Sequence, residues 1–471
     1  MSLFLLLLML ATCDSQYNLL TVPFKGAVMT YYPKNTTTTD FMVNVRYTVY
    51  YELCTNLGWQ CLSGDCGGEN TVVYTVKSSD IEGWCQTEGV STRQIPSNAP
   101  FQLWFNGSDW TSNANGIVRS KAVTLVELRT RSDTGKANTS PQTTILADLR
   151  VPSNCERVYS LLAFDPDGDD VKCRPGNASL SECDTCTLPL GLVLDNCTFS
   201  LMNSSVLEGS LKYVIQLVME DFPRQTITLT QSDGSRATLT TSDAISKIPV
   251  QFLLQLDPPA PSCTEGLYIP QFLPPTPTHG ALFITRYLQI DITVQANLST
   301  ISDLVVSGPH NVIVTLSGPG QFTLSWSPIQ DEDGESHSIC FVAEATLNSV
   351  VYQSVLRCVI AIVDLTPAAP SIPVSPLYVV NNTEPATTLP DTVNTSNITD
   401  SPSPLVVGTT PSPNPASAST PAPMNIVGLS VKVSSLTPLS DADIFLQVKN
   451  ILVSFGLPQD VVVRIVNAVQ L

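Results

Sequence analysis

Strict alternation of apolar and polar positions near the N-terminus is the clearest structural signal in the chain. Between residues 41 and 53, every odd position carries an apolar or aromatic side chain, and the even positions include Asn44, Arg46, Thr48 and Glu52. A period of two is the period at which side chains alternate between the faces of a β-strand. The pattern predicts a half-buried strand with one core face and one solvent face.

Short apolar runs bounded by turn residues continue as far as residue 365 or so. Asp233-Gly234 lies between two such runs and is typical of a β-hairpin turn. The spacing of the runs favours β-sandwich domains. Beyond residue 40 the predicted strands lie at 41–53, 101–105, 122–128, 158–164, 192–194, 213–219, 226–230, 248–256, 288–296 and 322–326.

The length of 471 residues exceeds what one core normally holds, so several domains are expected. We predict a mainly β protein of tandem disulfide-stapled Ig-like or cadherin-like β-sandwich domains, followed by a disordered linker and a small β-α-β module. Changes in composition place the boundaries. They give a signal peptide at 1–16, a cysteine-rich all-β domain at 17–148, sandwiches at 149–258 and 259–365, a Ser/Thr/Pro-rich linker at 366–423, and the β-α-β module at 424–471.

The first thirteen residues contain a Leu-rich run that is too short to span a bilayer and has the length of a signal-peptide core. The alternative, a buried N-terminal helix, is disfavoured because the run has no polar face. No later segment is long and uncharged enough to anchor the chain in a membrane, so we expect a secreted, extracellular protein. A net charge of −18 argues against nucleic acid and against anionic membrane surfaces as partners.

Cysteines and glycosylation motifs agree with this location. Without Cys13 in the predicted signal peptide, twelve cysteines remain, an even number as a disulfide framework requires. Only Cys183 and Cys186 have the CxxC spacing of a zinc ligand pair, and no second pair completes such a site. The predicted disulfide cysteines are Cys54, Cys61, Cys66, Cys85, Cys155, Cys173, Cys183, Cys186, Cys197, Cys263, Cys340 and Cys358. The predicted N-glycosylation sites are Asn35, Asn106, Asn138, Asn177, Asn196, Asn203, Asn297, Asn381, Asn394 and Asn397.

The parity of the cysteines predicts one bridge between the two sandwiches. The segment 149–258 holds five cysteines and the segment 259–365 holds three. Because free thiols are disfavoured in an oxidising compartment, one disulfide should cross the boundary. Cys263 lies just past it and Cys155 lies near the other edge of its domain, so we expect these two to pair. Cys340 and Cys358 flank a predicted hairpin and would pair with each other.

A family resemblance follows from three stretches of the second segment. They are Phe164-Asp165-Pro166-Asp167-Gly168-Asp169, Pro189-Leu190-Gly191-Leu192-Val193-Leu194-Asp195, and the run from Tyr213 to Asp221. Together they resemble the dystroglycan-type, cadherin-like Ig-fold repeat. Residues 320–345 resemble the latter half of the same repeat, although its Asp-rich turn is lacking there. The resemblance implies two cadherin-like sandwiches between 150 and 365, and it implies no particular function.

The chain also resembles a family of secreted glycoproteins of bony fishes. The stretches that carry this second resemblance are 84–86, 92–101, 219–223 and 257–263. It covers most of residues 20–365 and implies secretion, but no activity.

One side-chain cluster suggests a binding site. Asp165, Asp167 and Asp169 supply closely spaced carboxylate oxygens, which calcium prefers, so weak calcium binding is predicted here. Glu220 and Asp221 close the same repeat and could approach this turn. The alternative is an acidic turn, because Asp, Pro and Gly favour turns for local reasons. Arg129, Arg131 and Lys136 form a local basic segment with Asp133, which is interpreted as a solvated loop between strands. The alternative is a glycan- or protein-binding patch. The three histidines are expected on the surface, and the five tryptophans in the core of the first domain and the last sandwich rather than on a carbohydrate platform.

No nucleophile, base and orienting group can be assigned together, and no catalytic or cofactor motif occurs. We therefore expect no enzymatic activity and no cofactor other than calcium. The leading hypothesis is a non-catalytic adhesion or recognition glycoprotein with an extracellular protein or glycan ligand. The alternatives are a structural matrix or mucus glycoprotein and, less favoured, a secreted hydrolase.

Overall fold

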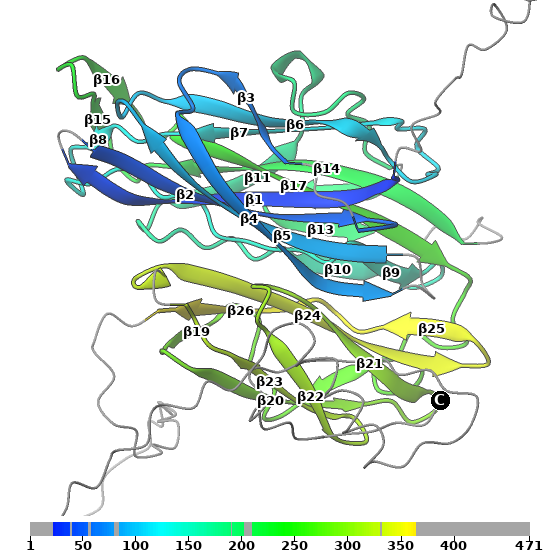
Figure 1. The fold of residues 1–471 in the computed structure, drawn as a ribbon. Coiled ribbons are helices and arrows are strands. Elements are labelled where there is room, and N and C mark those ends of the chain that lie inside the picture. Colours follow the sequence, from blue (N-terminus) through cyan, green and yellow to red (C-terminus); the bar gives the residue numbers. More distant parts are fainter. Residues whose placement is uncertain are drawn as a thin grey trace, which may run out of the picture. The chain divides into compact units, whose positions relative to one another are not determined.

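The computed structural model describes residues 22–363, except 38–39, 55–57, 80–83, 190, 202–209 and 330–331. The predicted signal peptide, linker and β-α-β module lie outside the described residues. Regular structure within them is β-strand, apart from short 3₁₀ turns such as the one at Ala178–Leu180. In this part of the chain no helix is long and apolar enough to cross a membrane. The mainly β prediction is confirmed (Figure 1).

The last group of strands forms a sandwich of two sheets. One sheet has the order β18-β20-β23-β22 and the other the order β19-β26-β24-β21, and their side chains share one core. When the strands are lettered in the order of the chain, the two sheets have the orders A-B-E-D and A′-G-F-C, as in an immunoglobulin-type sandwich. Their bounds are β18 Gln271–Leu273, β19 Ala281–Ile284, β20 Leu288–Gln295, β21 Thr300–Ser307, β22 Ile313–Gly318, β23 Gln321–Trp326, β24 Ser336–Leu347, the hairpin strand β25 Val350–Gln353, and β26 Arg357–Ile362.

The preceding group of strands repeats this order. The three-stranded sheet β10-β13-β12 corresponds to B-E-D, and β17-β14-β11 corresponds to G-F-C. β9 runs parallel to β17, as β19 does to β26. Two sandwiches of one topology therefore follow each other. The bounds are β9 Asp148–Pro152, β10 Arg157–Ser160, β11 Asp170–Pro175, β12 Leu192–Asp195, β13 Thr198–Leu201, β14 Leu211–Phe222 and β17 Ser246–Asp257.

The first segment does not form a sheet of its own. β17 pairs along one edge with β14, and along its other edge successively with β7, β1 and β9. At Gly26, β1 approaches so closely that a Cβ would lie 2.3 Å from the carbonyl oxygen of Gln251. The predicted boundary at 148/149 thus separates groups of strands along the chain, but not two sheets. The strands are β1 Phe24–Thr37, β2 Asp40–Tyr51, β3 Gln60–Ser63, β4 Gly68–Ser79, β5 Trp84–Ile95, β6 Phe101–Asp109 and β7 Arg119–Val126.

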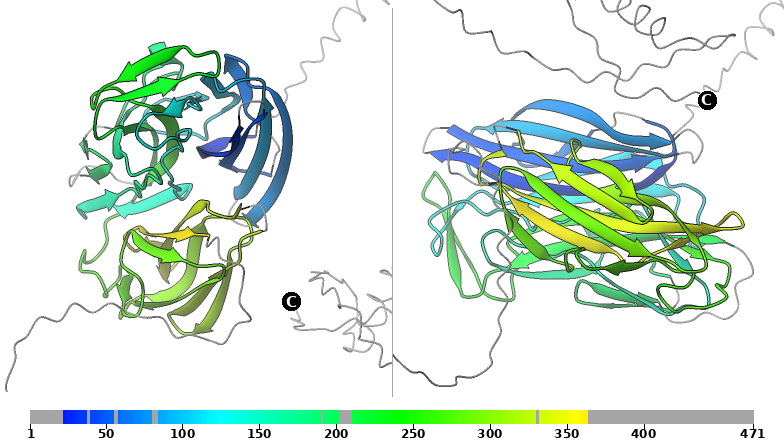
Figure 2. Two further views of the ribbon diagram at one scale, coloured as in Figure 1. Left: turned by 90° about the vertical axis from the view of Figure 1, so that its left-hand side faces the viewer. Right: turned by 90° about the horizontal axis from the view of Figure 1, so that it is seen from below.

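A small separate sheet ties the first two segments together at one end. β8 (Thr130–Arg131) belongs to the first segment and pairs with β15 (Ile227–Thr230), which forms a hairpin with β16 (Arg236–Leu239). Gly234 has a φ of +84° in the turn of this hairpin, as the Asp-Gly signal predicts. Along the chain the hairpin lies between strands F and G of the second sandwich, and β8 pairs with its strand β15. The green hairpin stands out at one end of the large sheets (Figure 2).

The odd positions of β2 form the buried face that their alternation predicts, but the even positions are not a solvent face. Arg46 forms ion pairs with Glu88 on β5 at 2.7 Å and with Glu332 of the last sandwich at 2.5 Å. The hydroxyl of Tyr50 lies 2.6 Å from that of Ser307 on β21. The last sandwich therefore covers the polar face of β2, a contact that a single strand pattern does not reveal.

All twelve cysteines of the predicted framework are paired. Cys155 bonds to Cys263 and Cys340 to Cys358, the two pairs that the parity argument predicts. The Cys155–Cys263 bridge links the second segment to the chain that enters the last sandwich. The remaining pairs are Cys54–Cys85, Cys61–Cys66, Cys173–Cys197 and Cys183–Cys186.

The crossing disulfide should contribute more to stability than a short-loop disulfide. Cys155 and Cys263 are 108 residues apart, whereas Cys183 and Cys186 are 3 apart. Loop-closure entropy predicts a loss in the free energy of unfolding of about 4–5 kcal/mol for the double alanine variant of the first pair and about 2 kcal/mol for the second. Urea unfolding of both variants would measure this, and equal losses would contradict it.

Candidate functional site

The Asp-rich turn predicted as a calcium site connects β10 to β11. Oδ1 of Asp165 accepts the backbone N–H groups of Asp167 at 2.9 Å and Asp169 at 3.2 Å. Gly168 takes the left-handed conformation, with a φ of +84°. These are the local reasons for which Asp and Gly favour turns. They fix the direction in which the turn presents its carboxylates.

The structure brings together two of the three predicted ligands and adds Asp221, one of the two acidic residues that close the same repeat and could approach the turn. Oxygens of Asp165, Asp169 and Asp221 lie within 4.8 Å of one another, and all three side chains are buried. Asp221 is near the end of β14, strand F of the same sandwich. Asp167 instead accepts the backbone N–H of Thr139 at 2.7 Å. The acidic cluster is therefore Asp165, Asp169 and Asp221.

A guanidinium lies among these carboxylates. Arg131 is 1% exposed, and both of its terminal nitrogens donate to Asp169, one of them at 2.8 Å. Its side chain also donates to Asn138 at 2.6 Å and to Asp133 at 3.1 Å. Pairing of β8 with β15 sets its position, since Arg131 lies opposite Leu229. The interpretation of this segment as a solvated loop is therefore wrong for Arg131.

The charges around Arg131 do not balance. Asp133, Asp165, Asp167, Asp169 and Asp221 surround one cation. Burial, reinforced by the charges of Asp221 and Asp169, raises the pKa of Asp165 to about 8. Burial likewise raises the pKa of Asp221 to about 6. The cluster thus holds a proton at neutral pH, or would accept a further cation in its place.

Calcium binding stays a prediction. In its favour, the donor set is all oxygen, and Oδ2 of Asp165 is buried without a hydrogen-bond partner among the described residues. Against it, Asp169 is engaged by Arg131 and Asp221 accepts bonds from Ser246 and Asn138. Arg131 supplies part of the positive charge that calcium would bring.

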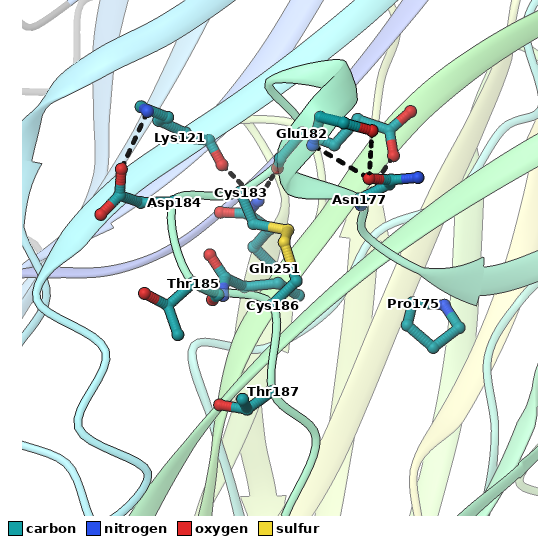
Figure 3. The surroundings of a disulfide bond; sticks show 12 residues. Lys121, Pro175, Asn177, Glu182, Cys183, Asp184, Thr185, Cys186, Thr187 and Gln251 are labelled. Carbon is teal, nitrogen blue, oxygen red and sulfur yellow. Dashed lines mark hydrogen bonds and ion pairs between the residues drawn. A yellow bond between two sulfur atoms is a disulfide. The ribbon is translucent and has the colours of Figure 1, made fainter.

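The CxxC pair does not offer thiolates to a metal ion. Figure 3 shows Cys183 bonded to Cys186, in a loop held by a hydrogen bond from Gln251 to the carbonyl of Glu182. Lys121 pairs with Asp184 in the same loop at 2.8 Å. The spacing here reflects a small disulfide loop.

Aromatic residues and histidines divide between core and interface. Trp59, Trp110 and Trp326 are buried, as the core interpretation predicts. His337 is 3% exposed, which contradicts the surface placement, and burial lowers its pKa well below the usual value. His310 stacks on Tyr74 with ring centroids 3.7 Å apart. The predicted surface positions of His310 and His337 are wrong because the contact of the last sandwich with β2 and β5 leaves no pattern in the sequence.

Among the predicted glycosylation sites, Asn106, Asn177, Asn196 and Asn297 are exposed. Asn138 is completely buried, and its amide donates to Asp221 at 2.7 Å and to Tyr31 at 3.2 Å. The side chain of Asn35 and residues 203, 381, 394 and 397 lie outside what the structure describes.

No protein-family model and no curated protein matches the chain. Among solved structures, it aligns with Drosophila N-cadherin EC1-4 at 12% identity, over 64% of this chain and 69% of that one, with a TM-score of 0.19. Human protocadherin-24 EC1-2 aligns at 12% identity over 49% and 100%, with a TM-score of 0.16. An endo-fucoidan hydrolase from glycoside hydrolase family 107 aligns at 12% identity over 71% and 42%, with a TM-score of 0.17. The chain thus spans less than half of that hydrolase.

These TM-scores are too low to carry an argument. The assignment to immunoglobulin-type and cadherin-like sandwiches rests instead on the strand order described above. The resemblance to secreted glycoproteins of bony fishes finds no support in the comparisons.

The raised pKa of Asp165 predicts how stability depends on pH. Because this pKa lies above its unfolded value, the folded state holds a proton that the unfolded chain releases. The stabilisation that the protonated Asp165 gives to the folded state is complete below about pH 4 and is lost as the pH rises through about 8. In EDTA, Asp165→Asn should flatten this dependence and raise the free energy of unfolding at pH 8 by roughly 2–5 kcal/mol, at about 1.4 kcal/mol per pKa unit.

Denaturant unfolding between pH 4 and pH 8.5 would check this result, with Asp243→Asn, an exposed site, as the control. Millimolar calcium added to the native chain at pH 8 tests the metal prediction in the same assay. A calcium-dependent gain that Asp165→Asn abolishes would support it. An equal pH slope in the native chain and in Asp165→Asn would contradict the assignment of the proton to Asp165.

The burial of Asn138 predicts an unoccupied sequon. A glycan would have to displace the bonds to Asp221 and Tyr31 and expose a completely buried side chain. Glycopeptide mass spectrometry of the secreted chain should find Asn138 bare and at least one of the exposed sites at Asn106, Asn177, Asn196 and Asn297 occupied. A glycan on Asn138 in folded protein would contradict the described packing.

Proposed function

We propose that the protein is a secreted, non-catalytic adhesion or recognition glycoprotein that binds an extracellular protein or glycan. The observation that carries the proposal is the coupling of the last sandwich to the rest of the described chain. The Cys155–Cys263 disulfide ties it to the second sandwich, and ion pairs tie it to β2 of the first segment. Such coupling holds loops and sheet faces in fixed relative positions. A preorganised surface loses less entropy when it binds a partner.

The extracellular location is supported by the chemistry of the chain. Six disulfides within the described residues require an oxidising compartment to persist. The exposed sequons and the N-terminal signal pattern are consistent with it. A structural matrix or mucus glycoprotein is the second candidate, favoured by the Ser/Thr/Pro composition of residues 366–423.

Multivalent display tests the recognition proposal. The full secreted chain, biotinylated enzymatically at a C-terminal tag and tetramerised on streptavidin, would be applied to arrays of extracellular proteins and to intact cells. We expect saturable binding to a small set of targets, with competition by the untagged chain. The matched control is the same tetramer after reduction and alkylation, which removes the disulfide framework and should abolish binding.

Two other results would redirect the assignment. Absence of saturable binding combined with heavy O-glycosylation and polymeric behaviour in light scattering would favour the matrix or mucus role. Turnover of generic ester, peptide or glycoside substrates by the purified chain would favour a hydrolase.

A further inference from the structure

The even positions of β2 form a polar wall together with residues of β1 and β5. Thr48 lies opposite Val28 on one side and opposite Glu88 on the other, and Arg46 lies opposite Thr30 in the next row. Residues that lie directly opposite each other in a sheet point to the same face. These side chains therefore share the face that the last sandwich covers.

The facing wall combines β24 of the last sandwich with residues 142–144, which lead to β9. Ile339 of β24 packs in the core of the last sandwich, whereas Cys340 packs in the core of the second. Since side chains alternate along a strand, Ser336 and Ser338 share the direction of Cys340 and point away from the core of the last sandwich. The hydroxyl of Thr143 lies in the same contact, beside β24.

A cavity of about 40 Å³ lies between these walls. All of its lining residues except Arg46 are buried. Thr143 and Ser338 are 5% and 8% exposed, and neither hydroxyl has a hydrogen-bond partner among the described residues. A buried hydroxyl without a partner is unfavourable, and most buried polar groups in proteins have at least one. Two such groups around one small cavity point to a ligand that satisfies both.

The other polar groups of the lining have partners elsewhere. One carboxylate oxygen of Glu88 accepts from Arg46 at 2.7 Å, and the other lies 2.7 Å from the backbone nitrogen of His310 and 2.8 Å from its ring. The hydroxyl of Thr144 lies 2.6 Å from that of Ser307. The ligand of the two remaining hydroxyls must therefore be small, uncharged, and able both to donate and to accept.

We propose that a cluster of ordered water molecules occupies this cavity and links Thr143 to Ser338. An internal water needs roughly 10–15 Å³ of such space and two to four polar partners, so about three molecules fit. A metal ion would lie beside the guanidinium of Arg46, and an organic ligand is too large for the volume. The contact of the last sandwich with the first segment is thus partly hydrated, and water-mediated hydrogen bonds hold the two together there. This inference is independent of the proposed recognition function.

The sign of a stability change tests the water cluster. Removal of a buried hydroxyl that has no partner at all would stabilise the folded chain, whereas removal of one that water satisfies destabilises it. We expect Thr143→Val and Ser338→Ala in the full secreted chain each to raise the equilibrium constant for unfolding by about three- to tenfold in urea titrations. Because the same waters join both residues, the double variant should lose less than the sum of the two single losses.

Two threonine variants serve as matched controls. Thr144→Val removes a hydroxyl that already has a protein partner, so it should destabilise the chain with or without water in the cavity. Thr315→Val alters an exposed position of β22 and should leave the equilibrium constant within twofold of that of the native chain.

A high-resolution crystal structure of the native chain supplies a readout that needs no variant. We expect water density within hydrogen-bond distance of Oγ1 of Thr143 and of Oγ of Ser338, and a loss of part of it in Thr143→Val. A dry cavity in the native crystal structure, a stability gain in either single variant, or additive losses in the double variant would overturn the inference.

Discussion

The backbone of β17 is shared between two parts of the chain, and the arrangement of the described residues depends on it. All twelve residues of this strand are buried. One edge donates to and accepts from β14, while the other edge is divided among β7, β1 and β9. A strand paired on both edges leaves no row of free N–H and C=O groups, so the cost of an exposed sheet edge is avoided. Because β17 closes the second sandwich and also holds β1, the first segment cannot separate from the second without breaking this ladder.

Two arginines, Arg131 buried and Arg46 half-buried, make ion pairs between the segments. Arg131 extends from the first segment into the acidic cluster of the second, and Arg46 extends from β2 to Glu332 of the last sandwich. Burying a charge is expensive, and a buried ion pair is weak evidence for net stability. Removing one partner, however, leaves an unpaired charge, so these contacts discriminate strongly against alternative arrangements of the segments. Hydrophobic contacts alone, being non-directional, would tolerate sliding.

The sequence predicted what a local pattern can encode. The alternation at residues 41–53 predicted the buried face of β2, Asp233-Gly234 predicted a hairpin, and counting cysteines led to Cys155–Cys263. Contacts between distant segments were missed. Arg46 alternates like any solvent-facing residue, and Arg131 lies in a basic, turn-rich stretch typical of a loop. The pairing of β8 with β15 spans almost one hundred residues and leaves no periodic signal, although a long side chain near several aspartates could have suggested an ion pair.

The same reasoning explains why the acidic turn was interpreted only in part. A turn with Asp at alternate positions supplies ligands within one loop, so the sequence pointed to Asp165, Asp167 and Asp169. In the folded chain the third member of the cluster is Asp221. The sequence placed Asp221 at the end of the same repeat, but its distance from the turn follows from the position of strand F and not from spacing. Asp167, the predicted ligand outside the cluster, accepts the backbone N–H of Thr139 in the segment that also contributes Asn138. Arg131, Asn138 and Thr139, which complete the site, thus belong to the first segment, which β17 and the β8–β15 pairing join to the second. The geometry of the acidic cluster therefore depends on how these two segments are joined.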